Sequence, residues 1–472
     1  MEDFDELFSK AKMAFSQNRV WLRANLLAKG IINSFGRGTI TSWLSGSGLQ
    51  FRDWSGFYRI FKQGGVDEEK LFDVVRQETI RSLPENTSDI IAHMDDTLFR
   101  KSGKKVNGVR WTRDPLGPPF QTNLVLGQRF VELTISKMED SGPCPAVSIP
   151  VDLFHCPAMQ KPKDDASLED KQAYNSSQKK EKLSAVGTER LNQLRKKLDK
   201  DGHAQRRLVV SVDGSFTNST VLKNLNPNIV LIGRVRKDSV LYARPDGQEA
   251  KGRKRVYGDK LPTPEQVRQS EDYPWQTIKA FAAGKLHEFD VKIVKGVRWR
   301  KSGKKDLQMM VIRPVAYRKT KKSKILYRQP AYLLCTDPQM KPQKLLQTYL
   351  WRWGIEVNFK EQKTFLGCGK AQVRKKESCQ KVPAFLTAVY SMILLANSKS
   401  QKQVLPRPKW YPVKKAKEYK PTTGDAINNL RAMSWSMQMK ISFSHLVNLD
   451  KVARSRKNAT NPLLSAVFYN RK

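Results

Sequence analysis

The stretch that decides the fold is "QRRLVVSVDGSF", Gln205–Phe216, in which an apolar run ends directly in Asp213. The same pattern occurs earlier in "SDIIAHMDDTLF", Ser88–Phe99, where apolar residues run into Asp95 and Asp96. Short apolar runs bounded by turn residues are typical of buried strands. A carboxylate at the end of a buried strand is costly unless a cation or a hydrogen-bond donor compensates it. The two stretches therefore predict core strands that end at a polar site.

Asp95 and Asp96 compete for a place in this site. Side chains alternate between the two faces of a strand, so only one of the pair is expected to point into the site. We favour Asp96, which directly precedes Thr97. Asp95 is then expected to face solvent or the residues around the site.

Helical and β-like patterns alternate along the chain and predict an α/β protein. The first residues show helical periodicity broken by short Gly and Ser stretches, whereas the middle of the chain has short β-like runs separated by turns and basic residues. We expect five segments: an all-α DNA-binding domain over 1–85, the first part of a mixed-sheet core over 86–235, a β-rich insertion over 236–342, the second part of the core over 343–398, and a basic helical region over 399–472.

The charge balance indicates a polyanionic partner. The 472 residues include 86 Lys and Arg against 45 Asp and Glu, a net charge of +41, and such an excess is typical of proteins that bind nucleic acid.

The most apolar run, Val382–Ala396, is shorter than the roughly 20 residues of a membrane-spanning helix, so we expect a core helix and no membrane partner. The acidic N-terminus does not resemble a secretory signal, and we expect a cytoplasmic protein associated with the nucleoid. Five cysteines without a CxxC pair argue against a disulfide framework or a zinc site.

A second stretch, "YLWRWGIEVNFKEQK", carries Tyr349, Arg352, Glu356 and Lys363. On one helix these four side chains would fall within an arc of roughly 60° and along a line of about 21 Å. One interpretation is a DNA-facing stripe, in which Glu356 binds a metal and the basic residues bind phosphates. The other is an ordinary helix with an ion pair between Arg352 and Glu356. Spacing alone leaves the two interpretations level.

Asp96, Asp213 and Glu356 together form a candidate set of metal ligands. Mg²⁺ prefers oxygen ligands and is commonly bound through a few carboxylates plus substrate phosphates. Two such ions about 4 Å apart hold the attacking and leaving oxygens of a phosphoryl transfer. Two strand-end acids and a helix Glu on a strongly basic chain are a stronger signal than any one of these acids alone.

The pattern Y-x2-R-x3-E-x6-K resembles the signature of bacterial insertion-sequence transposases of the DDE type, cut-and-paste enzymes of the retroviral-integrase superfamily. The segments "MDDT" and "VVSVDGSFTN" resemble the two aspartate strands of that family, and "GRGTITSWL" and "RDWSGFYRIF" resemble its helical N-terminal region. The resemblance extends from about residue 30 to residue 400. It implies an RNase H-like mixed-sheet core interrupted by the β-rich insertion, with an all-α N-terminal domain and a helical C-terminal region.

The resemblance also implies a function. Asp96, Asp213 and Glu356 would hold two Mg²⁺ ions, with Mn²⁺ as an alternative, for cleavage at transposon ends and joining of the 3′-OH ends to target DNA. Tyr349, Arg352 and Lys363 would contact DNA. The partners would be double-stranded DNA, as terminal inverted repeats and target, and a second copy of the chain.

Some relatives pass through a DNA hairpin and hold a flipped base on an aromatic residue. The segment "QPAYLLCTDP" places Tyr332 at that position, although a strand residue facing the core explains it equally well. Two alternative functions stay open: an RNase H-like DNA nuclease without strand transfer, and a catalytically silent DNA-binding derivative. For Trp351 and Trp353 we expect packing against the core.

Overall fold

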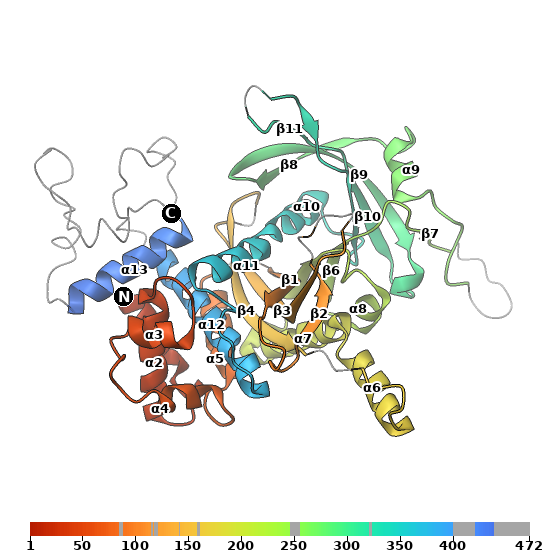
Figure 1. The fold of residues 1–472 in the computed structure, drawn as a ribbon. Coiled ribbons are helices and arrows are strands. Elements are labelled where there is room, and N and C mark those ends of the chain that lie inside the picture. Colours follow the sequence, from red (N-terminus) through yellow and green to blue (C-terminus); the bar gives the residue numbers. More distant parts are fainter. Residues whose placement is uncertain are drawn as a thin grey trace, which may run out of the picture. The chain divides into compact units, whose positions relative to one another are not determined.

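The computed structural model describes residues 1–84, 88–114, 117, 121–140, 142–157, 161–245, 255–320, 323–399 and 421–438. Most of the segment predicted over 399–472 therefore lies outside the described residues. The chain forms two compact units, the first from residues 1–78, 99–127 and 359–472 and the second from residues 79–98 and 128–358 (Figure 1). Each unit is thus assembled from stretches that are distant in the sequence.

The first unit is mainly helical. Phe8 of the N-terminal helix and Phe61 both pack edge-on against Phe385, at ring-centroid distances of 6.3 and 5.6 Å. Its helical segments are α1 (Glu2–Lys10), η1 (Ala11–Ala14), α2 (Asn18–Asn33), α3 (Ile40–Gly46), α4 (Ser55–Tyr58), η2 (Arg59–Phe61), most of α5 (Glu68–Arg81), most of α11 (Trp353–Phe365), α12 (Lys376–Lys399) and α13 (Thr423–Gln438). The unit also holds strand β2 (Arg110–Arg113), which pairs with Leu124–Gly127 at the start of β3. Residues from both ends of the chain therefore share one core.

Helix α12 contains the apolar run Val382–Ala396. By length and composition, the stretch Lys376–Ser398 could cross a membrane, but 89% of its most apolar window is buried inside the protein. Phe385, Tyr390 and Ile393 are fully buried. The predicted core helix is thus present, and it is longer than the apolar run alone suggests.

The second unit is built on a mixed sheet. Along the sheet the strands follow the order β3, β1, β5, β6, β13, β10, β9 and β7, with β4 beside β3 and β8 beside β9. Strands β1, β5 and β6 are parallel, and β13, β10 and β9 continue the sheet in antiparallel pairing. The strands are β1 (Asp89–Arg100), β3 (Leu124–Met138), β4 (Ala146–Cys156), β5 (Arg207–Val212), β6 (Ile229–Arg234), β7 (Tyr242–Ala243), β8 (Gln276–Ala282), β9 (Lys285–Arg298), β10 (Leu307–Ile312) and β13 (Ala331–Cys335), and a separate hairpin is formed by β11 (Ala316–Tyr317) and β12 (Leu326–Tyr327).

Helices cover both faces of this sheet. Ile91, Val209 and Leu333 lie in one buried cluster with Leu345 and Leu346 of α10, which therefore covers the face of the odd-numbered β1 residues. On the opposite face, Gly187 of α7 lies so close to Met94 that a Cβ there would be 2.8 Å from the sulfur. The helical segments of this unit are α6 (Leu168–Lys180), α7 (Leu183–Leu198), η3 (Asp199–His203), α8 (Ser219–Asn224), α9 (Pro264–Gln269), η4 (Arg300–Ser302) and α10 (Pro342–Trp351).

The segment 236–342 is rich in strands, as its sequence suggests. Its last strand, β13, pairs with β6, and β10 and β9 follow it in the same sheet. These strands carry buried Val, Ile, Leu and Met side chains, and all six residues of β10 are buried. They therefore extend the hydrophobic core. Apart from the β11–β12 hairpin, the segment therefore adds its strands to the core sheet.

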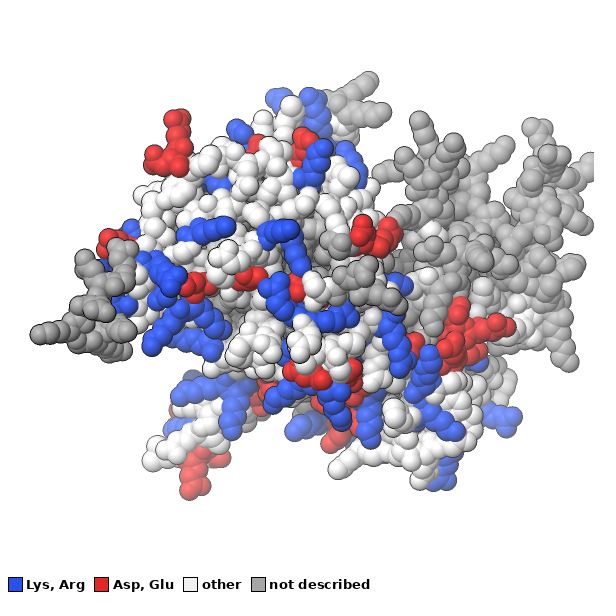
Figure 2. Space-filling view, turned by 180° about the vertical axis from the view of Figure 1, so that it is seen from behind, with Lys and Arg blue, Asp and Glu red and all other residues white. Residues whose placement is uncertain are grey.

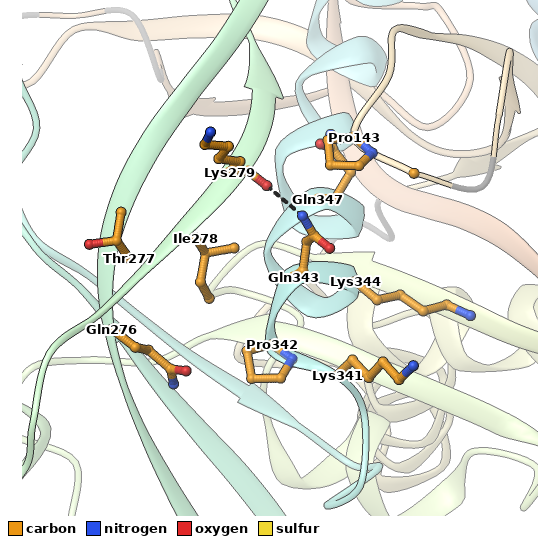
Figure 3. A pocket seen from close by; sticks show the side chains of 11 residues that line it. Pro143, Gln276, Thr277, Ile278, Lys279, Lys341, Pro342, Gln343, Lys344 and Gln347 are labelled. Atoms are coloured by element: carbon orange, nitrogen blue, oxygen red, sulfur yellow. Dashed lines mark hydrogen bonds between the residues drawn. The ribbon is translucent and has the colours of Figure 1, made fainter.

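Helix α10 also contacts the outer side of β8. The side-chain carbonyl of Gln347 accepts a hydrogen bond from the Phe281 amide (2.7 Å), and its amide group donates to the Phe281 carbonyl (3.1 Å). Gln343 donates to the Lys279 carbonyl at 3.1 Å (Figure 3). A cavity of about 700 Å³ lies beside these contacts and is lined by both elements. Two glutamines thus satisfy backbone groups on the side of β8 where no other described strand pairs.

The buried Gln347 gives the first prediction. Gln347→Leu leaves the backbone amide and carbonyl of Phe281 without partners, so we expect a loss of about 1–3 kcal/mol in the free energy of unfolding, measured by urea denaturation. Gln343→Ala is the matched control, because Gln343 is exposed and water replaces its bond. Equal effects of the two substitutions would contradict the proposed role of Gln347.

Candidate active site at the ends of β1 and β5

The register of β1 and β5 brings two carboxylates together. The last paired residues of these parallel strands are Met94 and Val212. Asp95 and Asp213 are the next residues on each strand, and neighbouring strands lie about 4.8 Å apart. The Asp213 charge accordingly raises the pKa of Asp95. The ends of the two strands therefore form one polar site.

His93 and Ser211 show which side of the sheet carries the site. They are paired in the register, and the His93 Nδ1 lies 2.6 Å from the Ser211 hydroxyl, while Nε2 lies 2.7 Å from Ser136. Burial, with a smaller effect of Arg352, lowers the pKa of His93 to about 3, so the ring is neutral. Asp95 lies two residues beyond His93 and so shares its face of the strand.

This geometry reverses the expected orientation of the two adjacent aspartates. Asp95 points into the site, where its Oδ2 accepts a hydrogen bond from Arg352 at 2.8 Å. Asp96 lies on the other face and forms an ion pair with Arg129 of β3 at 2.6 Å. The choice of Asp96 over Asp95 was wrong as a statement of geometry, because it rested on the following Thr97 and not on the strand register.

Arg352 connects the two parts of the site. Its guanidinium binds Asp95 through Nη1 and Glu356 through Nη2, at 2.8 and 2.7 Å. Burial lowers the pKa of Arg352, but Tyr349, Asp95 and Glu356 raise it by more, so the net pKa is raised. Arg352 is thus a charged clamp between a strand-end carboxylate and a helix carboxylate. The structure contains the ion pair of Arg352 with Glu356 that helical spacing suggested. It also links Arg352 to Asp95 at the end of β1.

The expected single helix is divided at Arg352. Helix α10 ends at Trp351 and α11 begins at Trp353. At the division, the Arg352 amide donates to the Tyr349 carbonyl and the Ile355 amide donates to the Arg352 carbonyl, both with a spacing of three residues. Such bonds tighten the turn relative to an α-helix. Tyr349 therefore lies on α10 and Glu356 on α11, with Arg352 between them.

Gly354 allows α11 to approach the sheet closely. A Cβ at Gly354 would lie 2.7 Å from the Cβ of Ser148 on β4, a separation that side chains do not adopt. One turn later, Asn358 donates a hydrogen bond to the Ser148 carbonyl at 2.9 Å. These two contacts fix the turn of α11 that carries Glu356.

Tyr349 and Arg234 complete the group of polar residues at this edge. Burial is the main cause that raises the pKa of Tyr349; Arg352 and Arg234 oppose it, and Asp213 adds to it. All four groups therefore lie within electrostatic range. Arg234 was missed in the sequence, although it ends the strand that follows β5 and is the next residue after Gly233, the partner of Val212.

The two other predicted DNA-contacting residues, Lys363 and Tyr332, can also be placed. Lys363 lies on α11 and its ammonium stands over the rings of Phe99 and Phe359, at 5.5 and 5.8 Å. Tyr332 is only 4% exposed, and its hydroxyl is hydrogen-bonded to Glu265. The prediction of a ring open to a flipped base is therefore contradicted, and Tyr332 is a core-facing strand residue.

The two tryptophans near Arg352 differ. Trp351 packs against the core cluster and donates to the Cys144 carbonyl at 2.8 Å, as expected. Trp353 is 64% exposed, so the expectation of core packing was wrong. Trp351 is the last residue of α10 and Trp353 the first of α11, so the two side chains lie on either side of the division at Arg352.

The donor set fits a divalent cation. Asp95, Asp213 and Glu356 offer only oxygen ligands, which Mg²⁺ prefers. Burial first, and the Asp213 charge second, raise the pKa of Asp95, so a cation bound between the two carboxylates would stabilise the charged form of Asp95. Arg352 is the present counter-charge of Asp95 and Glu356. Within the described ranges, no group of three His, Cys, Asp or Glu side chains is close enough to hold a metal on its own. Binding of an ion by all three acids would thus require Glu356 or Arg352 to move.

The family of the chain follows from a match to the DDE superfamily endonucleases, whose family model covers residues 15–306. The match includes more than half of the 472 residues, and the chain belongs to this family. Enzymes of this family generally use divalent metal ions. The chain matches none of the curated proteins. The matched range contains Asp95, Asp96 and Asp213 but ends before Glu356, so the place of Glu356 rests on the geometry above.

The pKa of Asp95 gives a pH prediction for the metal-free chain. Burial first, and Asp213 second, raise this pKa from 3.8 to about 7. Between about pH 4 and 7 the folded carboxyl keeps a proton that the unfolded chain has lost, so the contribution of Asp95 to stability falls as the pH rises. Relative to Asp95→Asn, the unmodified chain should lose up to about 3 kcal/mol in free energy of unfolding between pH 4.5 and 7.5.

Urea denaturation of both proteins in the presence of a chelator measures this difference. Asp213→Asn is the control for the second cause, because it removes the neighbouring charge and should reduce the difference. A difference that does not change with pH would show that the Asp95 carboxyl is solvated.

Proposed function

We propose that the chain is a DNA transposase that cleaves transposon ends and joins the 3′-OH ends to target DNA by two-metal-ion phosphoryl transfer. The observation that carries the proposal is the cluster of Asp95 and Asp213 with Arg352 and Glu356. The strand order β4, β3, β1, β5, β6, with β1, β5 and β6 parallel, supports an RNase H-like core. Family membership supports DNA as the substrate and hydrolysis or transfer of a phosphodiester as the reaction.

Each residue has a role in this proposal. Asp95, Asp213 and Glu356 would hold Mg²⁺ or Mn²⁺, and a bound ion supplies an activated nucleophile and charge for the leaving oxygen. Arg352 pairs with Asp95 and Glu356 before DNA binds and would offer its planar fork to a phosphate afterwards. Tyr349 lies under the Arg352 guanidinium, at 5.8 Å from the ring centroid, and restricts its orientation.

The charge of the chain supports a DNA partner. A net charge of +41 favours binding to phosphates and makes that binding dependent on salt. On the face drawn in Figure 2, Lys and Arg are distributed over much of the described surface, with smaller groups of Asp and Glu among them. Because a transposase must hold two transposon ends at once, we propose that two copies of the chain act together on terminal inverted repeats.

The hairpin route is left out of the proposal. It requires an accessible aromatic ring for a flipped base, and the ring of Tyr332 is buried beside Glu265. The simpler sequence is hydrolysis followed by attack of the freed 3′-OH on target DNA. Lys363, on α11 with Glu356, is proposed as a phosphate contact.

Substitution of the adjacent aspartates tests the site. Asp95→Asn, Asp213→Asn and Glu356→Gln should each reduce the rate of DNA cleavage with Mg²⁺ by at least about a hundredfold, because each removes a metal ligand. Asp96→Asn should retain cleavage within about tenfold, because Asp96 pairs with Arg129 on the other face of β1 and is not one of the proposed metal ligands. Circular dichroism confirms that each variant is folded. Loss of cleavage in Asp96→Asn with retention in Asp95→Asn would overturn the assignment.

The products distinguish a transposase from a nuclease. The purified chain is incubated with Mg²⁺, DNA carrying the flanking terminal repeats, and a supercoiled target. We expect nicked repeats and, later, repeats covalently joined to the target. Cleavage without joined products would identify a nuclease without strand transfer, and binding without cleavage would identify a silent derivative.

A further inference from the structure

A basic surface lies on the first unit, outside the carboxylate cluster. Residues 100–113 contain six Lys and Arg and residues 366–376 contain four, and neither stretch contains Asp or Glu. These two stretches are more than 250 residues apart in the sequence. Their contacts in the fold decide whether they form one surface.

Buried Lys101 holds the two stretches together. Its ammonium donates hydrogen bonds to the carbonyls of Gly369 and Ala371, at 2.7 and 2.8 Å, and the residue is 7% exposed. The amide of Asn107 donates to the Arg374 carbonyl at 3.2 Å. The Lys101 side chain and one backbone hydrogen bond thus join the two stretches, so the exposed side chains around them share one surface.

We name this surface the Lys101 platform. Its exposed members are Lys104, Lys105, Arg110, Arg113, Lys370, Arg374, Lys375 and Lys376. Two acids directly adjoin the stretches: Asp114 is buried and paired with Arg100 at 2.7 Å, and Glu377 is exposed next to Lys376. The platform therefore sets eight exposed Lys and Arg side chains beside one exposed acid, and this net positive charge favours an anionic partner.

Trp111 adds an aromatic side chain to the platform. It is 58% exposed on β2, although the same sequence, Gly-Val-Arg-Trp, recurs at the end of β9 with its tryptophan, Trp299, only 6% exposed. Trp111 also lines a cavity of about 370 Å³ together with Lys104 and Leu124. An exposed Trp beside exposed cations is typical of surfaces that contact a nucleic acid.

From these observations we infer that the Lys101 platform binds the backbone of double-stranded DNA, with Trp111 packed against a sugar at the edge of the bound segment. The inference rests on the proposed function and names a second DNA-contacting surface, separate from the catalytic carboxylates. Phosphates would lie against the exposed Lys and Arg side chains. Lys101 does not contact the DNA; it keeps the two stretches in place.

The test compares two variants of the full chain with equal charge. In the platform variant Lys104, Lys105, Arg374 and Lys375 are replaced by Gln; in the control variant Lys163, Lys179, Lys180 and Lys182, exposed residues in and around α6, are replaced by Gln. Binding to a 40-base-pair duplex is measured by fluorescence anisotropy at several salt concentrations in the presence of a chelator.

The platform variant should bind at least tenfold more weakly, and the slope of log K against log salt should decrease in magnitude by about 3 to 4, since each lost phosphate contact contributes about 0.9. The control variant should change the slope by less than about 1. Equal slopes for the two variants would overturn the inference while leaving the proposed function intact. Failure of the unmodified chain to bind DNA would overturn both.

Trp111→Ala provides an independent measurement. Loss of packing on a sugar should weaken binding about three- to tenfold without a change in the salt slope, because no phosphate contact is removed. Trp111→Phe should recover most of the affinity. Unchanged affinity in Trp111→Ala would remove Trp111 from the proposed surface.

Discussion

The parallel pairing of β1 with β5 is the constraint on which the candidate site depends. The hydrogen-bond register ends at Met94 and Val212, so Asp95 and Asp213 must follow side by side. Two carboxylates in that position repel each other. Burial first, and this repulsion second, raise the pKa of Asp95. Arg352, at the division between α10 and α11, pairs with Asp95 and also with Glu356. The position of each charged group thus follows from the strand register beneath it.

Much of this arrangement could be predicted from the sequence. The apolar runs before Asp95 and Asp213 are long enough to be strands, and the helical spacing of Arg352 and Glu356 is sufficient for an ion pair. The orientation of Asp95 and Asp96 was not predicted correctly, because both lie in one strand and only the pairing partner determines which one faces the site. An alignment of "AHMD" with "VSVD" would have matched His93 with Ser211 and Asp95 with Asp213. That signal is in the sequence, but it requires that the two strands be paired first.

Other errors have a common physical cause. The accessibility of Tyr332 depends on Glu265, which lies 67 residues away and binds its hydroxyl. The division of the helix at Arg352 depends on contacts of α11 with β4, where Gly354 and Asn358 meet Ser148. Similarly, the strands of the segment 236–342 were recognised, but their addition to the core sheet depends on the pairing of β13 with β6. Local patterns predict elements, whereas these features are determined by partners distant in the sequence.

The glutamines of α10 have a consequence for the protein in solution. Among the strands that the structure describes, β8 pairs with β9 alone, and the edge of a sheet is a template on which another chain can add a strand. Gln347 and Gln343 occupy backbone donors and acceptors of Lys279 and Phe281 on that edge. The side chains of α10 therefore act in place of a neighbouring strand and protect the sheet against edge-to-edge aggregation. Helix α10, which ends at the candidate site, thus also hinders the addition of a further strand at β8.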